Sequence, residues 1–298
     1  MTTHLALVGE QPMPVLLIDR HLRPDHTVLV CTGQTQAVAA RLQRLIRNCE
    51  VAPHVAAYEL NQVLKVLREL DRAEAAEEIV VNLTGGTKIM MLAAFAHAMQ
   101  RKQRFVYLES ERPPQRLHTF VAGEKRIQQT VKELPTLITV DDYLRAHLTD
   151  YHSDDYSRDE HGQLTSGGEF EQAVYEALSP KLDEVYVGVK PAGVGEQIEI
   201  DMVLRHGNQV AIAEVKLGRG EEGPKKGIDQ LSTAGSREYL GTYTRKLLIT
   251  AGYMSERVRQ LAAEKQVVHI QVSGYRSGRS IPPRDAGRLV ADVQKALA

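Results

Sequence analysis

The sequence predicts an α/β protein with two domains that are built on different sheets. The chain has 298 residues, which is enough for about two domains of roughly 100–200 residues each. In the first half, short apolar runs alternate with segments of helical periodicity, and this order predicts a parallel sheet covered by helices on both faces. In the second half, two apolar runs flank residues 206–208, whose Gly-Asn pair predicts an antiparallel hairpin.

The composition argues against several classes of protein. The net charge is −1 and 43 % of residues are hydrophobic, so the chain can bury a core but lacks the positive charge of a constitutive nucleic-acid-binding protein. Trp is absent, which leaves few rings on which bases could stack. Cys31 and Cys49 form no CxxC pair, and we find no signal peptide and no membrane-spanning run. We therefore expect a cytoplasmic protein that does not contact membranes.

The first half should contain four parallel strands and three helices. Continuous apolar runs predict strands over residues 5–8, 27–31, 79–83 and 105–108. Apolar residues three or four positions apart predict helices over residues 37–46, 60–70 and 89–99. In such a sheet the carboxyl ends of the strands meet at one edge, where ligands bind.

The loop Thr84-Gly85-Gly86-Thr87-Lys88 follows a predicted strand and opens a predicted helix. Its glycines allow the backbone to approach a ligand closely, and amides at a helix N-terminus favour phosphate. Thr84 and Thr87 add hydroxyl donors, and Lys88 adds positive charge. The loop is neither a Walker A motif nor GxGxxG. We expect it to bind a phosphate-containing ligand, and a simple Gly-rich turn with a helix cap is the alternative.

Two further loops should join this site at the same edge of the sheet. One follows the first predicted strand and the other follows the second. The residues expected to contact the ligand there are Gly9, Gln11, Met13, Thr32, Gly33 and Thr35.

The predicted domains are residues 1–135 and 167–298, with residues 136–166 as an inter-domain segment. A short helix is expected at 141–147. Residues 151–168 are polar and almost without large aliphatic residues, which is typical of an exposed loop. A metal site in that loop is the weaker alternative, because the spacing of its acidic residues and histidines matches no standard ligand pattern. The residues concerned are His152, Asp154, Asp155 and His161.

The second half has a different order of elements and is not a repeat of the first. Helices are expected around residues 170–178, 224–240 and 255–265. Strands are expected over residues 182–190, 197–204, 209–217, 246–250 and 267–272.

Charged residues interrupt two of these apolar strands. Asp201 lies in IEIDMVL, and Glu214 and Lys216 lie in VAIAEVKLG. Because side chains alternate along a strand, Glu214 and Lys216 share one face, and the hairpin brings Asp201 beside them. Two carboxylates could hold divalent cations, with the carbonyl of Val215 as a further ligand, while Lys216 orients water or contacts phosphate. An exposed, salt-bridged hairpin is the alternative, but buried charges without a role are costly.

The helix before the sheet offers a third carboxylate. Glu171 flanks the apolar stripe that begins at Phe170, in a position that could face the sheet and complete the metal shell. Glu169 and Glu176 lie on the same helix and are less favoured alternatives.

This arrangement resembles the PD-(D/E)xK nuclease superfamily, which has the restriction-endonuclease-like fold. The motif here is Asp201 followed by Glu214-Val215-Lys216, with Glu171 as the helical glutamate. In that superfamily, a Gln or basic residue on the helix that follows the hairpin, here expected around residues 224–240, often supports the catalytic centre. Gln230 would take that place, with an ordinary surface Gln as an equal alternative. Glu169-Phe170 replaces the bulky pair expected before the helical glutamate, which leaves the choice between Glu171 and Glu169 open.

NLTGGTKIM resembles the signature of the CRISPR-associated Rossmann fold (CARF) domain, a sensor of cyclic oligoadenylates. VGEQPMPVLLIDRHLRPD is similar to the first-strand loop and helix of one branch of that family, and ITVDDYLRAHL to its inter-lobe segment. That branch joins the sensor to a PD-(D/E)xK nuclease. The resemblance therefore covers nearly the whole chain, in the expected order.

The resemblance implies a homodimer that holds cyclic tetra-adenylate across its two-fold axis. It also implies an endonuclease of type III CRISPR antiviral defence that this ligand activates, with Mn²⁺ or Mg²⁺ as cofactor and DNA, RNA or both as substrate. Two alternatives stay open, namely a non-catalytic cyclic-nucleotide sensor and a ligand-independent repair or restriction nuclease. Slow cleavage of the ligand by the sensor also stays open, because Thr84, Thr87 and Lys88 could position a ring 2′-hydroxyl for attack, although no general base is evident.

Overall fold

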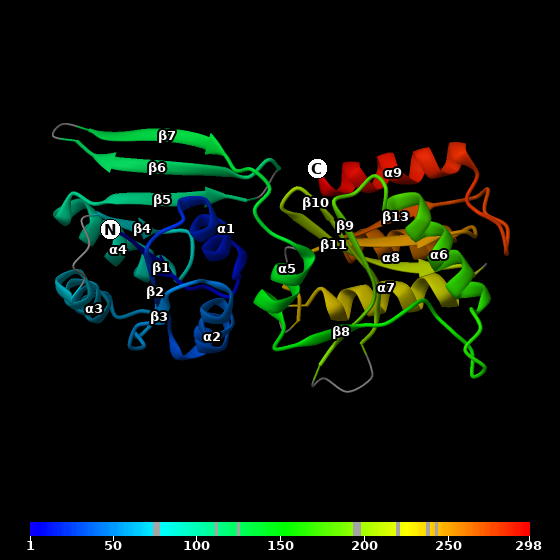
Figure 1. Ribbon diagram of the computed structural model, residues 1–298, viewed down its shortest axis with the longest axis horizontal. Coiled ribbons are helices and arrows are strands. Elements are labelled where there is room, and N and C mark those ends of the chain that lie inside the picture. The colour runs from blue at the N-terminus through cyan, green and yellow to red at the C-terminus, as the bar shows by residue number, and fades with distance from the viewer. Residues whose placement is uncertain are drawn as a thin grey trace. The chain divides into compact units, whose positions relative to one another are not determined.

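The computed structural model describes residues 1–73, 78–110, 113–123, 126–192, 198–218, 221–236, 239–241 and 244–298 (Figure 1). The chain divides into two compact units. The first unit comprises Met1–Ile138 with Arg145–His147, and the second comprises Thr139–Leu144 with Leu148–Ala298. Each unit contains its own sheet.

The sheet of the first unit has the order β3-β2-β1-β4-β5-β6-β7, and its first five strands are parallel. β6 and β7 extend it as an antiparallel hairpin. The strands are β1 Thr2–Leu7, β2 His26–Val30, β3 Cys49–Val51, β4 Glu78–Asn82, β5 Arg104–Glu109, β6 Arg116–Ala122 and β7 Ile127–Glu133. The helices are α1 Met13–Leu22, the short 3-10 helix η1 Gly33–Thr35, α2 Gln36–Leu45, α3 Leu60–Ala73 and α4 Lys88–Arg101.

The predicted parallel sheet is confirmed, and its strands are buried as expected. Leu5, Leu7, Val28 and Val81 pack in one core with residues of α3 and α4. Alternate residues such as Ala6 are equally buried on the other face. Strands buried on both faces read as continuous apolar runs, which is why the sequence predicts them well.

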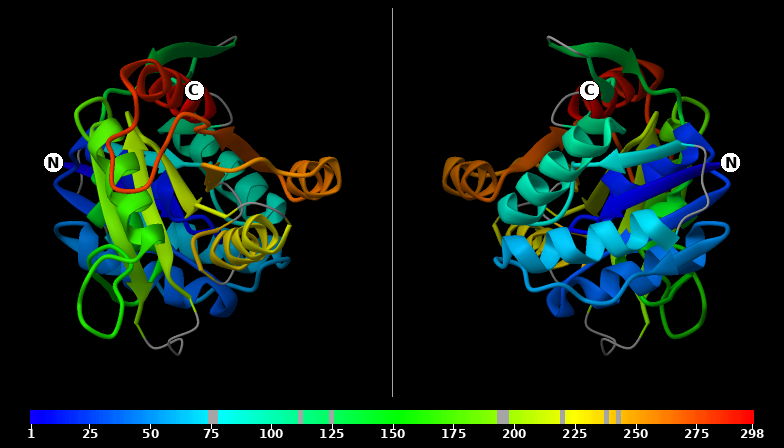
Figure 2. Two further views of the ribbon diagram at one scale, coloured as in Figure 1. Left: turned by 90° about the vertical axis from the view of Figure 1, so that its right-hand side faces the viewer. Right: turned by 90° about the vertical axis from the view of Figure 1, so that its left-hand side faces the viewer.

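The second unit contains the sheet β13-β12-β11-β10-β9-β8. Its strands are β8 Tyr151–Ser153, β9 Glu184–Pro191, β10 Ile200–His206, β11 Gln209–Lys216, β12 Arg245–Thr250 and β13 Val267–Gln271. Its helices are α6 Ser166–Leu178, α7 Glu222–Ala234, α8 Glu256–Glu264 and α9 Pro283–Leu297. α6 and α9 lie on one face of the sheet, and α7 and α8 lie on the other (Figure 2).

The predicted hairpin is confirmed as the antiparallel pair β10–β11, with Met202 opposite Ala213. Residue 197, where the first strand of the hairpin was expected to begin, lies outside the described residues. Phe170, Met202 and Ala213 belong to the core that α6 and α9 cover. Because side chains alternate along strands, the neighbours of these strand residues, Asp201 and Glu214, face the side of the sheet that α7 covers.

The predicted inter-domain segment contains the expected short helix and one strand that was not expected. The helix is α5, Val140–His147, whose residues are divided between the two units, and the strand is β8, which pairs with β9 in the second sheet. Most of residues 136–166 therefore belong to the second unit. Asp154 pairs with Lys190 and Asp155 pairs with Arg158, so these acidic side chains satisfy separate basic partners.

No described helix is both long enough and apolar enough to cross a membrane.

Candidate functional site

Three loops that the sequence assigned to a ligand site follow neighbouring strands. β2, β1 and β4 are adjacent and parallel, so the loops that follow them lie at one edge of the sheet. A Cβ atom placed on Gly9 would lie 3.1 Å from the backbone nitrogen of Gly86. The structure therefore brings the first and third loops into backbone contact.

Close packing and backbone conformation explain why residues 85 and 86 are both glycine. A Cβ atom on Gly85 would lie 2.0 Å from the carbonyl oxygen of Leu7. Gly86 has a φ of +73°, in the left-handed region that favours glycine. The glycines thus serve the packing of this loop against β1, in addition to any ligand that approaches.

The threonines of the loop are partly committed to the fold. Thr87 caps α4, because its Oγ1 accepts a hydrogen bond from the Met90 amide at 3.2 Å and donates to the Ala57 carbonyl at 2.5 Å. Thr84 Oγ1 accepts from the amide of Leu108 at 2.9 Å. Lys88 is exposed in the first turn of α4. This geometry leaves Lys88 and the helix N-terminus accessible to an anion.

A buried row of hydrogen bonds also supports Thr84. The Asn82 side chain accepts from the Thr84 amide at 2.9 Å and contacts His4 Nε2 at 3.4 Å. His4 Nδ1 lies 3.3 Å from Asp19, which accepts from Thr27 at 2.6 Å. His4 and Asn82 are fully buried. Polar groups buried in this way are stable only when paired, so the row fixes the start of the loop.

In the loop after β2, the two threonines are hydrogen-bonded to each other. Thr35 Oγ1 accepts from the Thr32 amide at 3.1 Å, and the two hydroxyls lie 3.3 Å apart. Gly33 is exposed, and nothing lies within 4 Å of a Cβ atom placed there. Gln11 and Met13, in the loop after β1, are half-buried.

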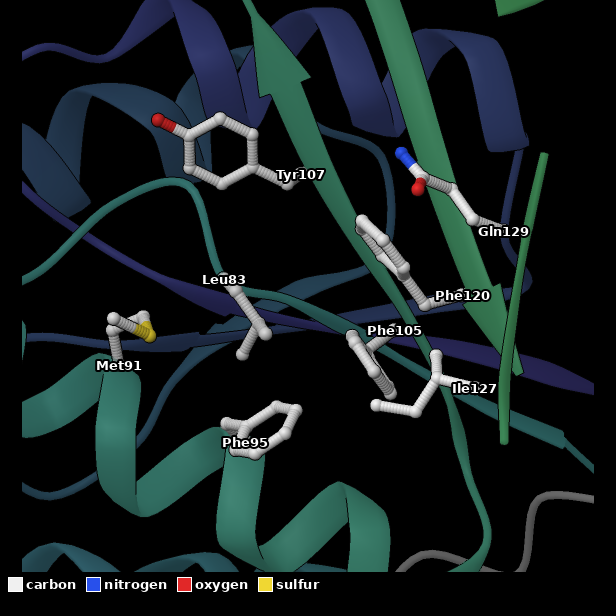
Figure 3. Close-up of a pocket in the computed structure, with 8 residues that line it drawn as sticks. All are labelled: Leu83, Met91, Phe95, Phe105, Tyr107, Phe120, Ile127 and Gln129. Atoms are coloured by element: carbon white, nitrogen blue, oxygen red, sulfur yellow. The ribbon is translucent and has the colours of Figure 1, made fainter. Parts of the chain in front are cut away.

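The first unit also has an apolar pocket of about 390 Å³, lined mainly by residues of α4 and of β5, β6 and β7 (Figure 3). Phe105 stacks on Phe120 with ring centroids 5.1 Å apart, and Phe95 meets Phe105 edge-on. The lining residues are Leu83, Met91, Phe95, Phe105, Tyr107, Phe120, Ile127 and Gln129. None of them carries a charge, so this pocket is unsuited to a phosphate.

In the second unit, the three residues that the motif predicted come together. The register of β10 and β11 places Asp201 opposite Glu214 on one face. The Nζ atom of Lys216 lies 2.9 Å from Asp201 Oδ2 and 2.6 Å from Glu214 Oε2. Glu214 is 1 % exposed and Asp201 is 8 % exposed. The result is a buried cluster of two carboxylates and one ammonium group.

The backbone of Val215 also contacts the cluster. Its amide donates to Asp201 Oδ2 at 2.7 Å, and its carbonyl as a metal ligand stays a prediction. Together with Lys216, this amide supplies two donors to the same oxygen of Asp201. The aspartate is thereby held in a fixed orientation.

The cluster has strongly shifted protonation. Burial and the charge of Asp201 raise the pKa of Glu214 to about 8. Burial lowers the pKa of Lys216, but Glu214 and Asp201 together outweigh this effect and leave it above the ordinary value. Glu214 Oε2 is buried and, despite its ion pair with Lys216, accepts no directed hydrogen bond from the described residues. A buried carboxyl oxygen whose protonated form is favoured can take up a cation when the proton leaves.

α7 lies directly over this cluster. A Cβ atom on Gly227 would lie 3.5 Å from Glu214 Cβ and 3.4 Å from Lys216 Cγ. Gln230 is three residues further along the helix, and its Oε1 atom is buried without a hydrogen-bond donor in the described part of the chain. The sequence named Gln230 as a supporting residue, and the structure places it on the helix that covers the cluster.

The structure separates the candidate helical glutamates. Glu171 is 5 % exposed, and burial followed by the charge of Asp201 raises its pKa. Glu169 instead accepts hydrogen bonds from Ser277 at 2.6 Å and from the Gly278 amide at 3.1 Å. Glu176 is exposed and accepts from Gln172. Of these three glutamates, Glu171 is therefore the one whose protonation is affected by the charge of Asp201.

Sequence patterns do not identify the residue that holds Glu171. Ser157, in the predicted loop, donates its amide to Glu171 Oε2 at 2.9 Å and its hydroxyl to Oε1 at 2.8 Å. Among the described residues, no group of three His, Cys, Asp or Glu side chains is close enough to hold a metal ion as they stand. Asp201 and Glu214 supply the hard oxygen ligands that Mn²⁺ and Mg²⁺ prefer, so the donor chemistry of this pair fits such an ion.

Residues 3–143 match the family model of the Card1 CARF domain. The first unit has a CARF-like fold. No curated protein matches the chain significantly in sequence.

Solved structures resemble both units, the CARF-like unit included. Can2 from Sulfobacillus thermosulfidooxidans, solved in complex with cyclic tetra-adenylate, has a TM-score of 0.74 and 14 % identity, and the match covers 100 % of both chains. Protein VC1899 from Vibrio cholerae has a TM-score of 0.73 and 12 % identity, covering 99 % of this chain and 98 % of that one. A type III CRISPR defence DNA nuclease activated by cyclic oligoadenylate has a TM-score of 0.63 and 16 % identity, covering 97 % of this chain and 51 % of that one. At these identities the likeness concerns the fold.

We predict that Gly85→Ala destabilises the protein by about 2 kcal/mol or more, because its Cβ atom would meet the Leu7 carbonyl. Gly33→Ala is the matched control, since it adds a methyl group in open space and should change stability by no more than about 0.5 kcal/mol. Urea denaturation of both variants measures the difference. Equal stabilities would contradict the proposed loop packing.

We also predict a pH-dependent stability that Glu214 controls. Between its ordinary pKa of 4.5 and about 8, folded Glu214 keeps a proton that the unfolded chain releases, so the free energy of unfolding falls as pH rises through this window. Glu214→Gln should remove that fall, and its stability relative to the unsubstituted protein should increase towards pH 8. Denaturation in EDTA at several pH values tests this, and a pH-independent difference would contradict it.

Proposed function

We propose that this protein is a metal-dependent nuclease of type III CRISPR defence that a cyclic oligoadenylate activates. The observation that carries the nuclease assignment is the position of Lys216 Nζ, 2.9 Å from Asp201 and 2.6 Å from Glu214 on a hairpin. This proximity supports the resemblance of Asp201 and Glu214-Val215-Lys216 to the PD-(D/E)xK motif. The likeness in fold to a cyclic-oligoadenylate-activated DNA nuclease supports it.

Asp201 and Glu214 would hold Mn²⁺ or Mg²⁺, with Glu171 and the Val215 backbone contributing to the shell. When bound, such a metal lowers the pKa of its water and stabilises charge on the phosphate. Lys216 keeps its positive charge, because its pKa is raised, and so can stabilise the negative charge that builds up on the phosphate during attack. α7 excludes water from one side of the cluster, which strengthens these interactions.

The substrate needs basic contacts, and the segment between β13 and α9 offers them. Arg276 and Arg279 are exposed there, and Arg284 is exposed in the first turn of α9. The segment is fixed to the first turn of α6 by the two bonds to Glu169 described above and by Tyr275, whose ring lies 4.6 Å from that of Phe170. We propose that these arginines contact the backbone of DNA or RNA near the cluster. In a chain of net charge −1, such a local patch would bind nucleic acid weakly.

For the first unit, we propose that two copies bind one cyclic tetra-adenylate at the loops after β1, β2 and β4. The CARF-like fold and the cyclic tetra-adenylate bound to Can2 support this ligand. Lys88 and the N-terminus of α4 would receive its phosphates.

The central test is cleavage of supercoiled plasmid and single-stranded RNA in Mn²⁺, with and without cyclic tetra-adenylate. We predict ligand-dependent cleavage of at least one substrate, and a loss of about a hundredfold or more in Glu214→Gln, because a metal ligand is removed. Glu176→Gln, on the exposed side of α6, is the matched control and should retain full activity.

The other outcomes separate the alternatives. Full-rate cleavage without the ligand would indicate a ligand-independent nuclease. Ligand binding without any cleavage would indicate a non-catalytic sensor. Chromatography of the ligand after long incubation shows whether the first unit degrades it.

We predict that Lys88→Ala weakens cyclic tetra-adenylate binding by about tenfold, because one charge-assisted contact to phosphate is lost. Lys65→Ala removes an exposed lysine from α3 in the same unit and should leave affinity unchanged. Isothermal titration calorimetry measures both dissociation constants. Equal affinities for the two variants would place the ligand elsewhere.

A further inference from the structure

Ser157 contacts both oxygens of the buried Glu171 carboxylate. Its amide donates to Oε2 at 2.9 Å and its hydroxyl donates to Oε1 at 2.8 Å. Two donors on two different oxygens fix both the position and the plane of a carboxylate. A glutamate side chain otherwise has several rotamers, so this pairing selects one of them.

Ser157 is itself held against the first turn of α6. Its carbonyl accepts from the amide of Thr165 at 3.0 Å and from the Thr165 hydroxyl at 3.2 Å. Thr165 caps α6 by accepting from the Gly168 amide at 3.0 Å. A Cβ atom on Gly168 would lie 2.1 Å from the Ser157 carbonyl oxygen. Glycine at 168 therefore allows the Ser157 backbone to lie directly on the helix that carries Glu171.

Burial of Glu171 calls for a compensating interaction. Glu171 is 5 % exposed, and the negative charge of Asp201 acts on it unfavourably. A buried carboxylate that lacks hydrogen-bond donors destabilises a fold, so the two Ser157 bonds account for the presence of Glu171 in this position. Each oxygen keeps a further lone pair that can face a cation.

We propose that Ser157 is a positioning residue for the proposed metal centre, which it serves by fixing the orientation of the Glu171 carboxylate. This inference rests on the proposed nuclease function. Ligating carboxylates are generally held by outer hydrogen bonds, and removal of such a bond typically weakens metal binding. Ser157 lies in a segment whose sequence indicates only an exposed loop, so the assignment comes from the structure alone.

The test is Mn²⁺ binding to the full chain without substrate, measured from the electron paramagnetic resonance signal of unbound Mn²⁺. Ser157→Ala removes the hydroxyl donor and should raise the dissociation constant about tenfold. Ser157→Thr keeps a hydroxyl and should restore most of the affinity. Ser153→Ala is the matched control, because Ser153 donates to the Val187 carbonyl and does not touch Glu171.

A double-mutant cycle separates positioning from general stability. In a Glu171→Gln background, Ser157→Ala should have little further effect on Mn²⁺ affinity, because both changes act through the same carboxylate. Unchanged affinity in Ser157→Ala would overturn the inference, as would a lower melting temperature of the metal-free protein with no change in affinity. If Ser157→Ala weakens Mn²⁺ binding as expected but the unsubstituted protein cleaves no nucleic acid, the positioning role is supported and the nuclease function is contradicted.

Discussion

The ion cluster on the β10–β11 hairpin is the interaction on which the second unit depends. Two carboxylates and one ammonium group lie on strands where the residues next to both carboxylates are apolar, and Glu214 is 1 % exposed. Burial of charge is tolerated only when each group is paired or protonated, and the structure meets this condition with Lys216, the Val215 amide and a raised pKa at Glu214. Two neighbouring residues match this arrangement. Gly227 allows α7 to pack against Glu214 and Lys216, and the Ser157 amide donates a hydrogen bond to Glu171.

The first unit is constrained by contact between loop backbones. Gly85 packs against the Leu7 carbonyl, and the Thr87 hydroxyl is used by the cap of α4 and by Ala57. The buried row from Asp19 through His4 to Asn82 then fixes Thr84. The groups left for the ligand are the exposed Lys88, the amides at the N-terminus of α4 and the open backbone at Gly33.

Local patterns predicted the features that depend on neighbours in sequence. Continuous apolar runs identified β1, β2, β4 and β5, and the alternation of side chains along β11 predicted that Glu214 and Lys216 share one face. The hairpin β6–β7 escaped prediction because every residue of β7 is exposed, so no burial pattern marks it. β8 is three residues long and is defined only by its pairing with β9. The Ser157–Glu171 contact joins a featureless loop to a helix 14 residues away, and no periodicity reports such a contact. The role of Gly85 likewise depends on β1, far away in sequence.

In the proposed metal centre, a divalent cation replaces a proton that the Asp201–Glu214 pair holds. Isothermal titration calorimetry of Mn²⁺ binding near pH 7, repeated in buffers with different ionisation enthalpies, counts the protons released. Because the pKa of Glu214 is raised to about 8, the unsubstituted protein should release about one proton per ion bound, since ligands must be deprotonated. Glu214→Gln should bind weakly and release none. Tight binding of Mn²⁺ with no proton release, or equal release by Glu214→Gln, would contradict this account of the cluster.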